Sequence, residues 1–312
     1  MEMLPAPILQ SSLDAIARLK ALLLDSVNSP ESKRAYGRAV EDFLNWYQWK
    51  SPGTGFTKAT VQAYRAHLIE KGQSASTVNV RMSAIRRLAA EAADNGLMAP
   101  ELASGVGRVK GVKRDGIRTG NWLTVRQAEE LVNAPDTNTL KGRRDRALFA
   151  VLIGCGLRRE ETATLTLEHI QQRDARWVIV DMHGKGGRVR TVPMPSWTKV
   201  SIDAWTSAAG FTEGRVFRPV NRGDRLSGGS MTAQSIFETV KKYAAQVGVH
   251  NIAPHDLRRT FAKLAHRGRA ALEQIQLSLG HSSVQTTERY LGVRQDLTDA
   301  PCDRLGLKLS AL

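Results

Sequence analysis

Hydrophobic residues in the first hundred positions recur every three to four residues, which is typical of amphipathic helices. Ser29 followed by Pro30, and later Thr57, are residues that start helices, whereas Gly72 and Gly96 are typical stops. We therefore predict four helices in this region. Their apolar positions are Leu13, Ile16, Ala17 and Leu23; Tyr36, Val40, Phe43, Leu44 and Tyr47; Val61, Tyr64, Leu68 and Ile69; and Val80, Ile85, Leu88 and Ala89.

Beyond residue 121 the pattern stays mainly helical, with one interruption rich in β-branched residues. Thr124 and Gln127 fit a capping box that opens a helix. Residues 176–183 and 188–192 have the composition of strands and flank a glycine-rich turn, which predicts an antiparallel hairpin with Lys185 at its tip. Further helices are predicted near 140–154, 196–209, 231–247, 255–267, 271–279 and 284–291.

A glycine-rich segment over 104–121 separates these two blocks. It has little bulky apolar content and no helical period, so we predict an interdomain linker. The expected order is a helical domain over 1–103, the linker over 104–121, a second domain over 122–291 and a C-terminal tail over 292–312. The predicted fold class is mostly α, with an N-terminal four-helix bundle and an α-rich C-terminal domain that contains a small antiparallel sheet.

The distribution of charge points to a partner. The chain has 45 Lys and Arg against 30 Asp and Glu, a formal net charge of +15. Residues 1–103 carry +2, 104–121 carry +4 and 122–312 carry +9. A basic run by itself is most often a solvated loop, but the position of this one between two folded blocks favours a linker that crosses a phosphate backbone.

Composition also excludes several classes of protein. Hydrophobic residues make up 42% and charged residues 24%, which excludes a disordered or collagen-like chain. Apolar stretches such as 147–153 are far shorter than the ~20 residues of a membrane-spanning helix, and the N-terminus lacks a signal-peptide pattern. Cys155 and Cys302 have no Cys or His at metal-ligand spacing. We expect a cytoplasmic protein with no membrane contact, no metal and no cofactor.

Candidate chemistry begins with Arg158, which follows the expected helix break at Gly156 and has Glu161 three residues later. A turn at this point can direct the arginine into a cleft, although surface arginines at a helix end would give the same pattern. Lys185 at the hairpin tip can reach a substrate or remain a solvated turn residue.

Two further segments follow. His255 and Arg258 lie three apart on the helix that Pro254 introduces, so their side chains point the same way. His281 follows a predicted helix stop, and Tyr290 lies nine residues later on a short helix. Taken singly, a turn histidine is usually a cap and such a tyrosine is usually half-buried packing.

The order and spacing of the whole series resemble the catalytic signature of the tyrosine recombinase (phage integrase) family. The series is Arg158, Lys185, His255, Arg258, His281 and Tyr290. The neighbouring residues are similar as well: Gly156-Leu157 before the arginine, Gly184 and Gly186 around the lysine, Val192-Pro193 after a basic strand, Thr260-Phe261-Ala262 after the second arginine, and Leu279-Gly280 before the second histidine.

The resemblance covers most of 122–291, and the N-terminal block, with Ser76-Thr77-Val78 and Ser83-Ala84-Ile85-Arg86, is similar to the family's SAM-like core-binding domain. Arg159 and Glu160 are more polar than the residues common at these positions. Because no large arm-binding domain precedes the helical block, the chain looks more like Xer-like or mobile-element members.

The chemistry needs positive surroundings, because free tyrosine has a pKa near ~10 and must attack a negatively charged phosphate. Two guanidiniums can hold the non-bridging oxygens through forked hydrogen bonds. The resemblance implies that Tyr290 forms a 3′-phosphotyrosyl link, that Lys185 protonates the leaving oxygen, that His255 is a base or hydrogen-bond partner and that His281 donates to the phosphate. Glu161 is expected to orient the arginine or a histidine.

The resemblance also implies a site-specific DNA recombinase that integrates, excises or resolves DNA as a tetramer on double-stranded recombination sites, associated with the nucleoid when bound. A partner recombinase or directionality factor remains open. The tail is expected either to fray or to pack on a neighbouring protomer. Candidate DNA contacts are Arg81, Arg86, Arg108, Lys110, Lys113, Arg114, Arg118, Arg188 and Arg259.

Two alternatives are kept. A type IB topoisomerase-like enzyme relaxes DNA with similar chemistry and no synapsis, and a DNA-binding accessory protein keeps the fold without the chemistry. The complete set of six residues argues against the second alternative.

Overall fold

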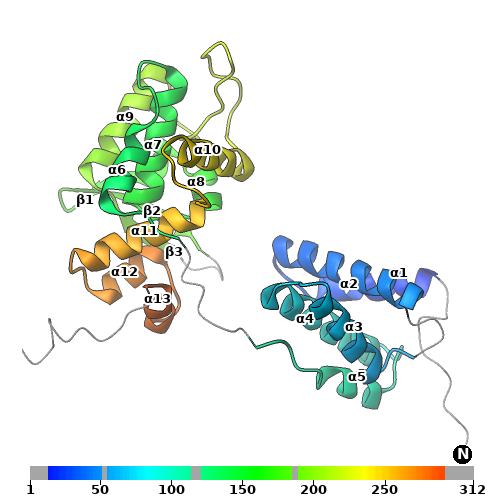
Figure 1. Ribbon diagram of the computed structural model, residues 1–312. Coiled ribbons are helices and arrows are strands. Elements are labelled where there is room, and N and C mark those ends of the chain that lie inside the picture. Colours follow the sequence, from blue (N-terminus) through cyan, green and yellow to red (C-terminus); the bar gives the residue numbers. More distant parts are fainter. Residues whose placement is uncertain (1–12, 51–54, 114–120, 185–188, 292–312) are drawn as a thin grey trace, which may run out of the picture. The chain divides into compact units, whose positions relative to one another are not determined.

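The computed structural model describes residues 13–50, 55–113, 121–184 and 189–291 (Figure 1). The chain divides into two compact units, one up to residue 117 and one from residue 118 onward, and each has its own core. The division falls inside the segment for which the sequence predicts a linker. In the four described ranges, no helix is both long enough and apolar enough to span a membrane.

Helices make up most of the described part of the first unit. They are α1 (Leu13–Asp25), α2 (Pro30–Lys50), α3 (Lys58–Glu70), α4 (Ala75–Asp94) and α5 (Pro100–Gly107). The first four are the predicted helices, and two of their starts follow the expected chemistry: the Ser29 hydroxyl accepts the Ser32 N–H, and the Thr57 hydroxyl accepts the Thr60 N–H. Gly72 and Gly96, which follow α3 and α4, have positive φ angles.

The fifth helix corrects the predicted start of the linker, because residues 104–107 belong to α5. Pro100 occupies the first turn of α5, and Val106 is fully buried against the other helices. Two glycines hide this helix from a periodicity argument, since its stability comes from packing of an apolar face and not from intrinsic propensity.

Aromatic side chains fill the centre of the first unit. The Phe43 ring lies 5.1 Å from the Tyr64 ring in an edge-on contact and 5.4 Å from the Phe56 ring. Phe43, Phe56 and Tyr64 are almost completely buried. These contacts join α2 and α3 to the loop between them.

The second unit contains a three-stranded sheet that packs against helices and has β1 at its outer edge (Figure 1). The predicted helices and both predicted strands are present, whereas α8, a short 3₁₀-helix (Leu167–His169) and β1 are additional. The elements are α6 (Val125–Asn133), α7 (Leu140–Gly154), α8 (Arg159–Thr164), β1 (Ile170–Arg173), β2 (Arg176–His183), β3 (Val189–Pro193), α9 (Ser196–Ala209), α10 (Ala233–Gln246), α11 (Pro254–Arg267), α12 (Leu272–Leu279) and α13 (Val284–Leu291).

Helix α7 is the centre of this unit. Every residue from Ala147 to Gly154 is buried, and α9 runs along the helix. Strand β2 pairs with β1 and β3 in antiparallel register, with Ile179 opposite Val192 and Met182 opposite Arg190. A register shift between Ile179 and Met182 includes Asp181, whose φ of 54° is left-handed.

The described residues of the second unit form two hydrophobic clusters of unequal size. The larger cluster includes most of α7 together with side chains from the sheet, α9 and α10. The smaller cluster has four buried members, Ala262, Ile275, Leu279 and Leu291, and holds α12 and α13 against α11. Elements α11, α12, α13 and β3 therefore gather at one end of the unit (Figure 1).

Candidate active site

Arg158 is placed by a sharp break in the chain after α7. Gly156 has a φ of +60°, and a Cβ at this position would lie only 2.6 Å from the Phe261 ring, so a glycine is required on both counts. Arg158 then caps α8, where its backbone N–H donates to Glu161 Oε2 at 2.8 Å. The same arginine donates from Nη1 to Glu161 Oε1 at 2.6 Å. The predicted Arg158–Glu161 pair is present.

Glu161 brings three arginines together. Its buried carboxylate accepts two hydrogen bonds from Arg190 of β3, at 2.9 and 2.8 Å, in addition to the bonds from Arg158. Arg258 of α11 approaches the same carboxylate, with Nη1 at 3.8 Å from Oε2. One negative charge is thus surrounded by three positive charges, which leaves a net positive site.

Arg258 is held by backbone carbonyl groups from two other segments. It is 1% exposed, and its guanidinium donates to Gly156 O at 2.6 Å and to Leu279 O. The first acceptor lies in the break after α7 and the second at the end of α12. These bonds fix the guanidinium before any ligand binds.

The electrostatic consequences differ between the carboxylate and the guanidinium. Burial would raise the pKa of Glu161, but hydrogen bonds from Arg190 and from the Arg158 backbone, with the charges of both arginines, lower it to about 2. Burial and the neighbouring Arg158 lower the pKa of Arg258 to about 9. Both groups therefore remain charged at neutral pH.

Tyr290 lies on α13, and its ring contacts two histidines. The ring centroid is 5.5 Å from that of His255 and 5.2 Å from that of His281, both in edge-on contacts. The Tyr290 hydroxyl donates to the His255 carbonyl oxygen at 3.2 Å, and the Arg259 guanidinium lies 4.8 Å from the ring centroid. His281 also forms a 3.0 Å hydrogen bond between Nδ1 and the Thr287 hydroxyl.

The three ring groups are all neutral at pH 7. Burial raises the pKa of Tyr290 to about 12, although Arg258 and Arg259 oppose this shift. Burial, followed by the charges of Arg258 and Arg158, lowers the pKa of His281 to about 4. Partial desolvation of the His255 ring by the groups packed around it, followed by the charges of Arg259 and Arg258, lowers the pKa of His255 as well, although the residue as a whole is exposed. The site thus places a protonated phenol beside two unprotonated imidazoles.

The structure brings five of the six predicted catalytic residues into this site, from four separate segments of the chain. Lys185, the sixth, lies outside the described residues, as do Arg114, Arg118, Arg188 and the tail over 292–312. His255 and Arg258 share a helix, yet Arg258 is buried whereas His255 is exposed at the start of α11.

The remaining candidate DNA contacts have varied surroundings. Arg81 forms an ion pair with Asp42, whereas Arg86 donates to neutral acceptors on its own helix, the Met82 carbonyl and the Ser83 hydroxyl. In the segment after α5, Lys110 and Lys113 are exposed, and Arg108 donates to the Ser104 hydroxyl at 3.0 Å.

Arg190 is the site residue that sequence reasoning missed. The signal is the strand period: Arg190 lies two residues before the fully buried Val192, so both side chains face the same side of the sheet. An arginine directed inward from a strand needs a buried partner, because an unpaired buried charge is costly.

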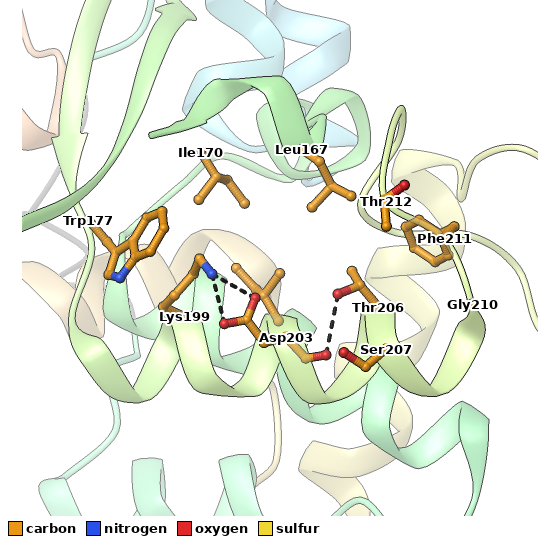
Figure 2. A pocket seen from close by; sticks show the side chains of 11 residues that line it. Leu167, Ile170, Trp177, Lys199, Asp203, Thr206, Ser207, Gly210, Phe211 and Thr212 are labelled. Carbon is orange, nitrogen blue, oxygen red and sulfur yellow. Dashed lines mark hydrogen bonds and ion pairs between the residues drawn. The ribbon is translucent and has the colours of Figure 1, made fainter. Parts of the chain in front are cut away.

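A cavity elsewhere in the unit contains none of these residues. It lies beside α9 and is lined by Trp177, Lys199, Asp203 and Phe211, among others (Figure 2). Lys199 is positioned 4.0 Å from the Trp177 ring centroid and pairs with Asp203 at 2.7 Å. Within the described ranges, no group of three or more His, Cys, Asp or Glu residues is arranged to hold a metal ion.

Comparisons with known proteins agree with this geometry. Residues 121–296 match the phage integrase family, and residues 17–96 match the N-terminal SAM-like domain of phage integrases. Tyrosine recombinase XerC of Thermodesulfovibrio yellowstonii is 29% identical over 88% of this chain and 90% of its own length. Tyrosine recombinase XerD of Pseudomonas putida is 34% identical over 55% of this chain and 57% of its own length.

Solved structures share the fold at lower identity. The XerH site-specific recombinase bound to difH substrate has a TM-score of 0.71 at 16% identity, covering 95% of this chain and 96% of that one. A lambda integrase dimer bound to a core site has a TM-score of 0.69 at 15% identity, covering 92% and 79%. The chain therefore belongs to the phage integrase family of tyrosine recombinases, enzymes of site-specific DNA recombination.

Proposed function

We propose that this chain recombines double-stranded DNA at specific sites by cleaving each strand with Tyr290 and rejoining the strand to a new end. The observation that supports this most directly is the position of the Tyr290 ring, 5.5 Å from His255 and 5.2 Å from His281, beside the Arg158–Arg258 cluster. A phenol with these neighbours has imidazoles nearby that can accept its proton. The neighbouring guanidiniums can bind the phosphate that the phenol attacks.

Arg158 and Arg258 bind the non-bridging oxygens of the scissile phosphate in this proposal. Negative charge grows on these oxygens in the pentacoordinate transition state, so guanidiniums fixed beforehand stabilise that state more than the ground state. Arg258 is fixed by two carbonyl groups, and Arg158, whose side chain is 30% exposed, remains within reach of solvent. Each donor of this kind typically contributes about 3 kcal/mol.

The proton of Tyr290 must leave during the attack, because its pKa of about 12 keeps the phenol protonated at pH 7. His255 is the acceptor in this proposal, since its lowered pKa keeps the imidazole neutral. The hydroxyl first gives up its 3.2 Å bond to the His255 carbonyl oxygen. When Nδ1 of His281 accepts from Thr287, its Nε2–H is left to donate to a phosphate oxygen.

The products of this step are a 3′-phosphotyrosyl link and a 5′-hydroxyl group. The bond between the leaving 5′-oxygen and phosphorus breaks as the tyrosyl bond forms, and Lys185 supplies the proton to that oxygen. The reverse reaction with a 5′-hydroxyl of another duplex rejoins the strand, so no external energy source is needed.

The wider assembly is also part of this proposal. Exposed Lys110 and Lys113 contact the phosphate backbone, the protein works in the cytoplasm, and four chains assemble on two DNA sites. The tail over 292–312 packs on a neighbouring protomer. If a chain truncated after Gly292 synapses and exchanges strands normally, the role given to the tail is wrong.

The test uses a nicked duplex on which the broken strand cannot be rejoined. Its sequence is taken from genomic fragments of the source organism that the wild-type chain captures covalently. We expect Tyr290→Phe to bind this duplex with unchanged affinity and to form no denaturant-stable adduct. Tyr243→Phe is the matched control, because Tyr243 is a buried tyrosine that packs against Phe149, and it should form adduct normally. An adduct with Tyr290→Phe would exclude this nucleophile.

A plasmid with two copies of the captured sequence distinguishes recombination from the two alternative functions. Deletion or inversion products indicate recombination. Relaxation without either product would indicate a topoisomerase-like activity, and a wild-type chain that binds without forming adduct would indicate an accessory protein.

A further inference from the structure

Arg190 of β3 is a buried charged residue that the proposed chemistry does not use. Its side chain is 8% exposed, and it donates to both oxygens of Glu161 at 2.9 and 2.8 Å. Its Nε donates to the Ser278 carbonyl oxygen at 3.0 Å. These three bonds use one donor on each nitrogen of the guanidinium and direct the buried group toward Glu161 and Ser278.

The contacts of Glu161 explain why such a residue matters. Its Oε1 lies 2.6 Å from Arg158 and its Oε2 lies 3.8 Å from Arg258, the two residues proposed to bind phosphate. A carboxylate in this position is a competitor of the phosphate, because both anions fit the same guanidiniums. The forked pair with Arg190 engages both carboxylate oxygens and offsets their charge.

We propose that Arg190 is a positioning residue that holds Glu161 and offsets its charge, so that Arg158 and Arg258 stay directed toward the scissile phosphate. The inference rests on the proposed function, in which those two arginines bind phosphate. Without Arg190, Glu161 turns toward Arg158 and Arg258 and draws them away from the substrate.

The same side chain also connects the sheet to the turn before His281. Ser278 lies in the last turn of α12, and the next residue but one, Gly280, packs directly on Arg190. A Cβ at Gly280 would lie 2.9 Å from Arg190 Cδ. Arg190 therefore fixes the carboxylate and supports the turn with one guanidinium.

The test is a double-mutant cycle with Arg190→Met, Glu161→Gln and the combined variant. On the nicked duplex described above, we expect Arg190→Met to slow adduct formation about 100-fold, the loss expected when reacting groups are misplaced. Glu161→Gln in the same chain removes the competing charge, and we expect it to restore the rate about tenfold over Arg190→Met alone. Arg190→Lys, which keeps the charge but not the fork, should lie between wild type and Arg190→Met.

A second measurement does not depend on recombination. Inorganic phosphate is titrated into each protein without DNA, at a temperature where every variant is folded by circular dichroism. We expect the phosphate dissociation constant to rise about tenfold in Arg190→Met and to return toward the wild-type value in the combined variant. If the proposed function is wrong, the wild-type chain forms no adduct, but the phosphate titration still shows this pattern of dissociation constants.

Arg144→Met is the matched control for loss of a buried ion pair. Arg144 is 4% exposed, pairs with Asp145 and lies near the opposite end of α7 from the site. The Arg144→Met variant should have a lower melting temperature, with the rate of adduct formation and the phosphate affinity unchanged.

Two outcomes overturn the inference. In the first, Arg190→Met forms adduct at the wild-type rate and binds phosphate with the wild-type affinity. The other is a combined variant no better than Arg190→Met in both measurements, because a purely structural role for Arg190 gives no rescue when Glu161 loses its charge.

Discussion

The two halves of the candidate site are built differently. The arginine half, around Glu161, rests on the break after α7 and on α8, β3 and α11, and has short charge-assisted hydrogen bonds of 2.6 to 2.9 Å. The nucleophile half, on α12 and α13, rests on a cluster of four buried residues, and its tyrosine hydroxyl has one 3.2 Å bond to a backbone carbonyl. The groups proposed to bind phosphate are thus fixed before a ligand binds, whereas the proposed nucleophile sits on a short helix with a small buried cluster and one weak hydrogen bond.

The halves also differ in their charge states. Glu161, with a pKa of about 2, and Arg258, with a pKa of about 9, are ionised at neutral pH, whereas Tyr290, His255 and His281 are neutral. Under the proposed function, this difference assigns affinity for the phosphate and timing of the attack to separate parts of the fold. Changes in the two halves should therefore have distinguishable effects.

The largest effect is expected in the arginine half. Arg258→Lys keeps a positive charge but cannot reach the Gly156 and Leu279 carbonyl groups together while facing a phosphate. We expect adduct formation on the nicked duplex to fall about 10²- to 10³-fold. Arg259→Lys, one residue later beside the Tyr290 ring, is the control and should lose much less. Equal losses in both would contradict the division between the halves.

The two halves should lose their contributions to folding stability in different ranges of acid pH. The pKa of Glu161 is lowered from 4.5 to about 2, so the unfolded chain takes up this proton first and stability falls as pH drops from 4.5 toward 2. The loss is on the order of 3 kcal/mol. The pKa of His281 is lowered from 6.5 to about 4, so its contribution is complete above pH 6.5 and is lost between 6.5 and 4.

Urea unfolding across this pH range measures both contributions. Glu161→Gln should flatten the lower part of the profile, and His281→Asn should reduce the slope of the upper part. The assignment of the two pH ranges is wrong if Glu161→Gln changes the slope between pH 6.5 and 4.5, or if His281→Asn changes it below pH 4.

A smaller effect is expected at Thr287 in the nucleophile half. Thr287→Val removes the hydroxyl bonded to His281 Nδ1 at 3.0 Å while keeping the side-chain shape. Loss of one hydrogen bond of this kind costs about 1 kcal/mol, so adduct formation should slow by roughly fivefold with unchanged DNA binding. Thr286→Val, at the exposed neighbouring position, serves as the control. A loss of DNA affinity in Thr287→Val would show that His281 belongs with the arginine half.

The smallest expected effect is that of metal chelation. Because guanidiniums are assigned the charge stabilisation, cleavage should persist at an unchanged rate in EDTA. Complete loss of cleavage on chelation, reversed by added Mg²⁺, would indicate that the arginine half works with a cation.

Much of the fold follows from local sequence. Period and capping residues predict α1 to α4, and the segment near Gly156 ends α7 because a left-handed residue stops a helix there. These features depend on residues within one or two helical turns of each other, so they can be predicted from the sequence without knowledge of tertiary contacts. Helix α5 was not predicted, because its stability comes from packing on α3 and α4. Strand β1 was not predicted although its partner is close in sequence, because the turn that joins it to β2 is formed by Asp174 and Ala175 and lacks the usual glycine.

The sequence by itself determined the order of the six signature residues and the family that the order resembles. Only the tertiary structure decided what each described residue touches: Arg190 meets Glu161 across 29 positions, and Tyr290 meets the His255 carbonyl across 35. The physical reason is that the charge and pKa of a buried group depend on its neighbours in space, and those neighbours arrive from separate elements of the fold.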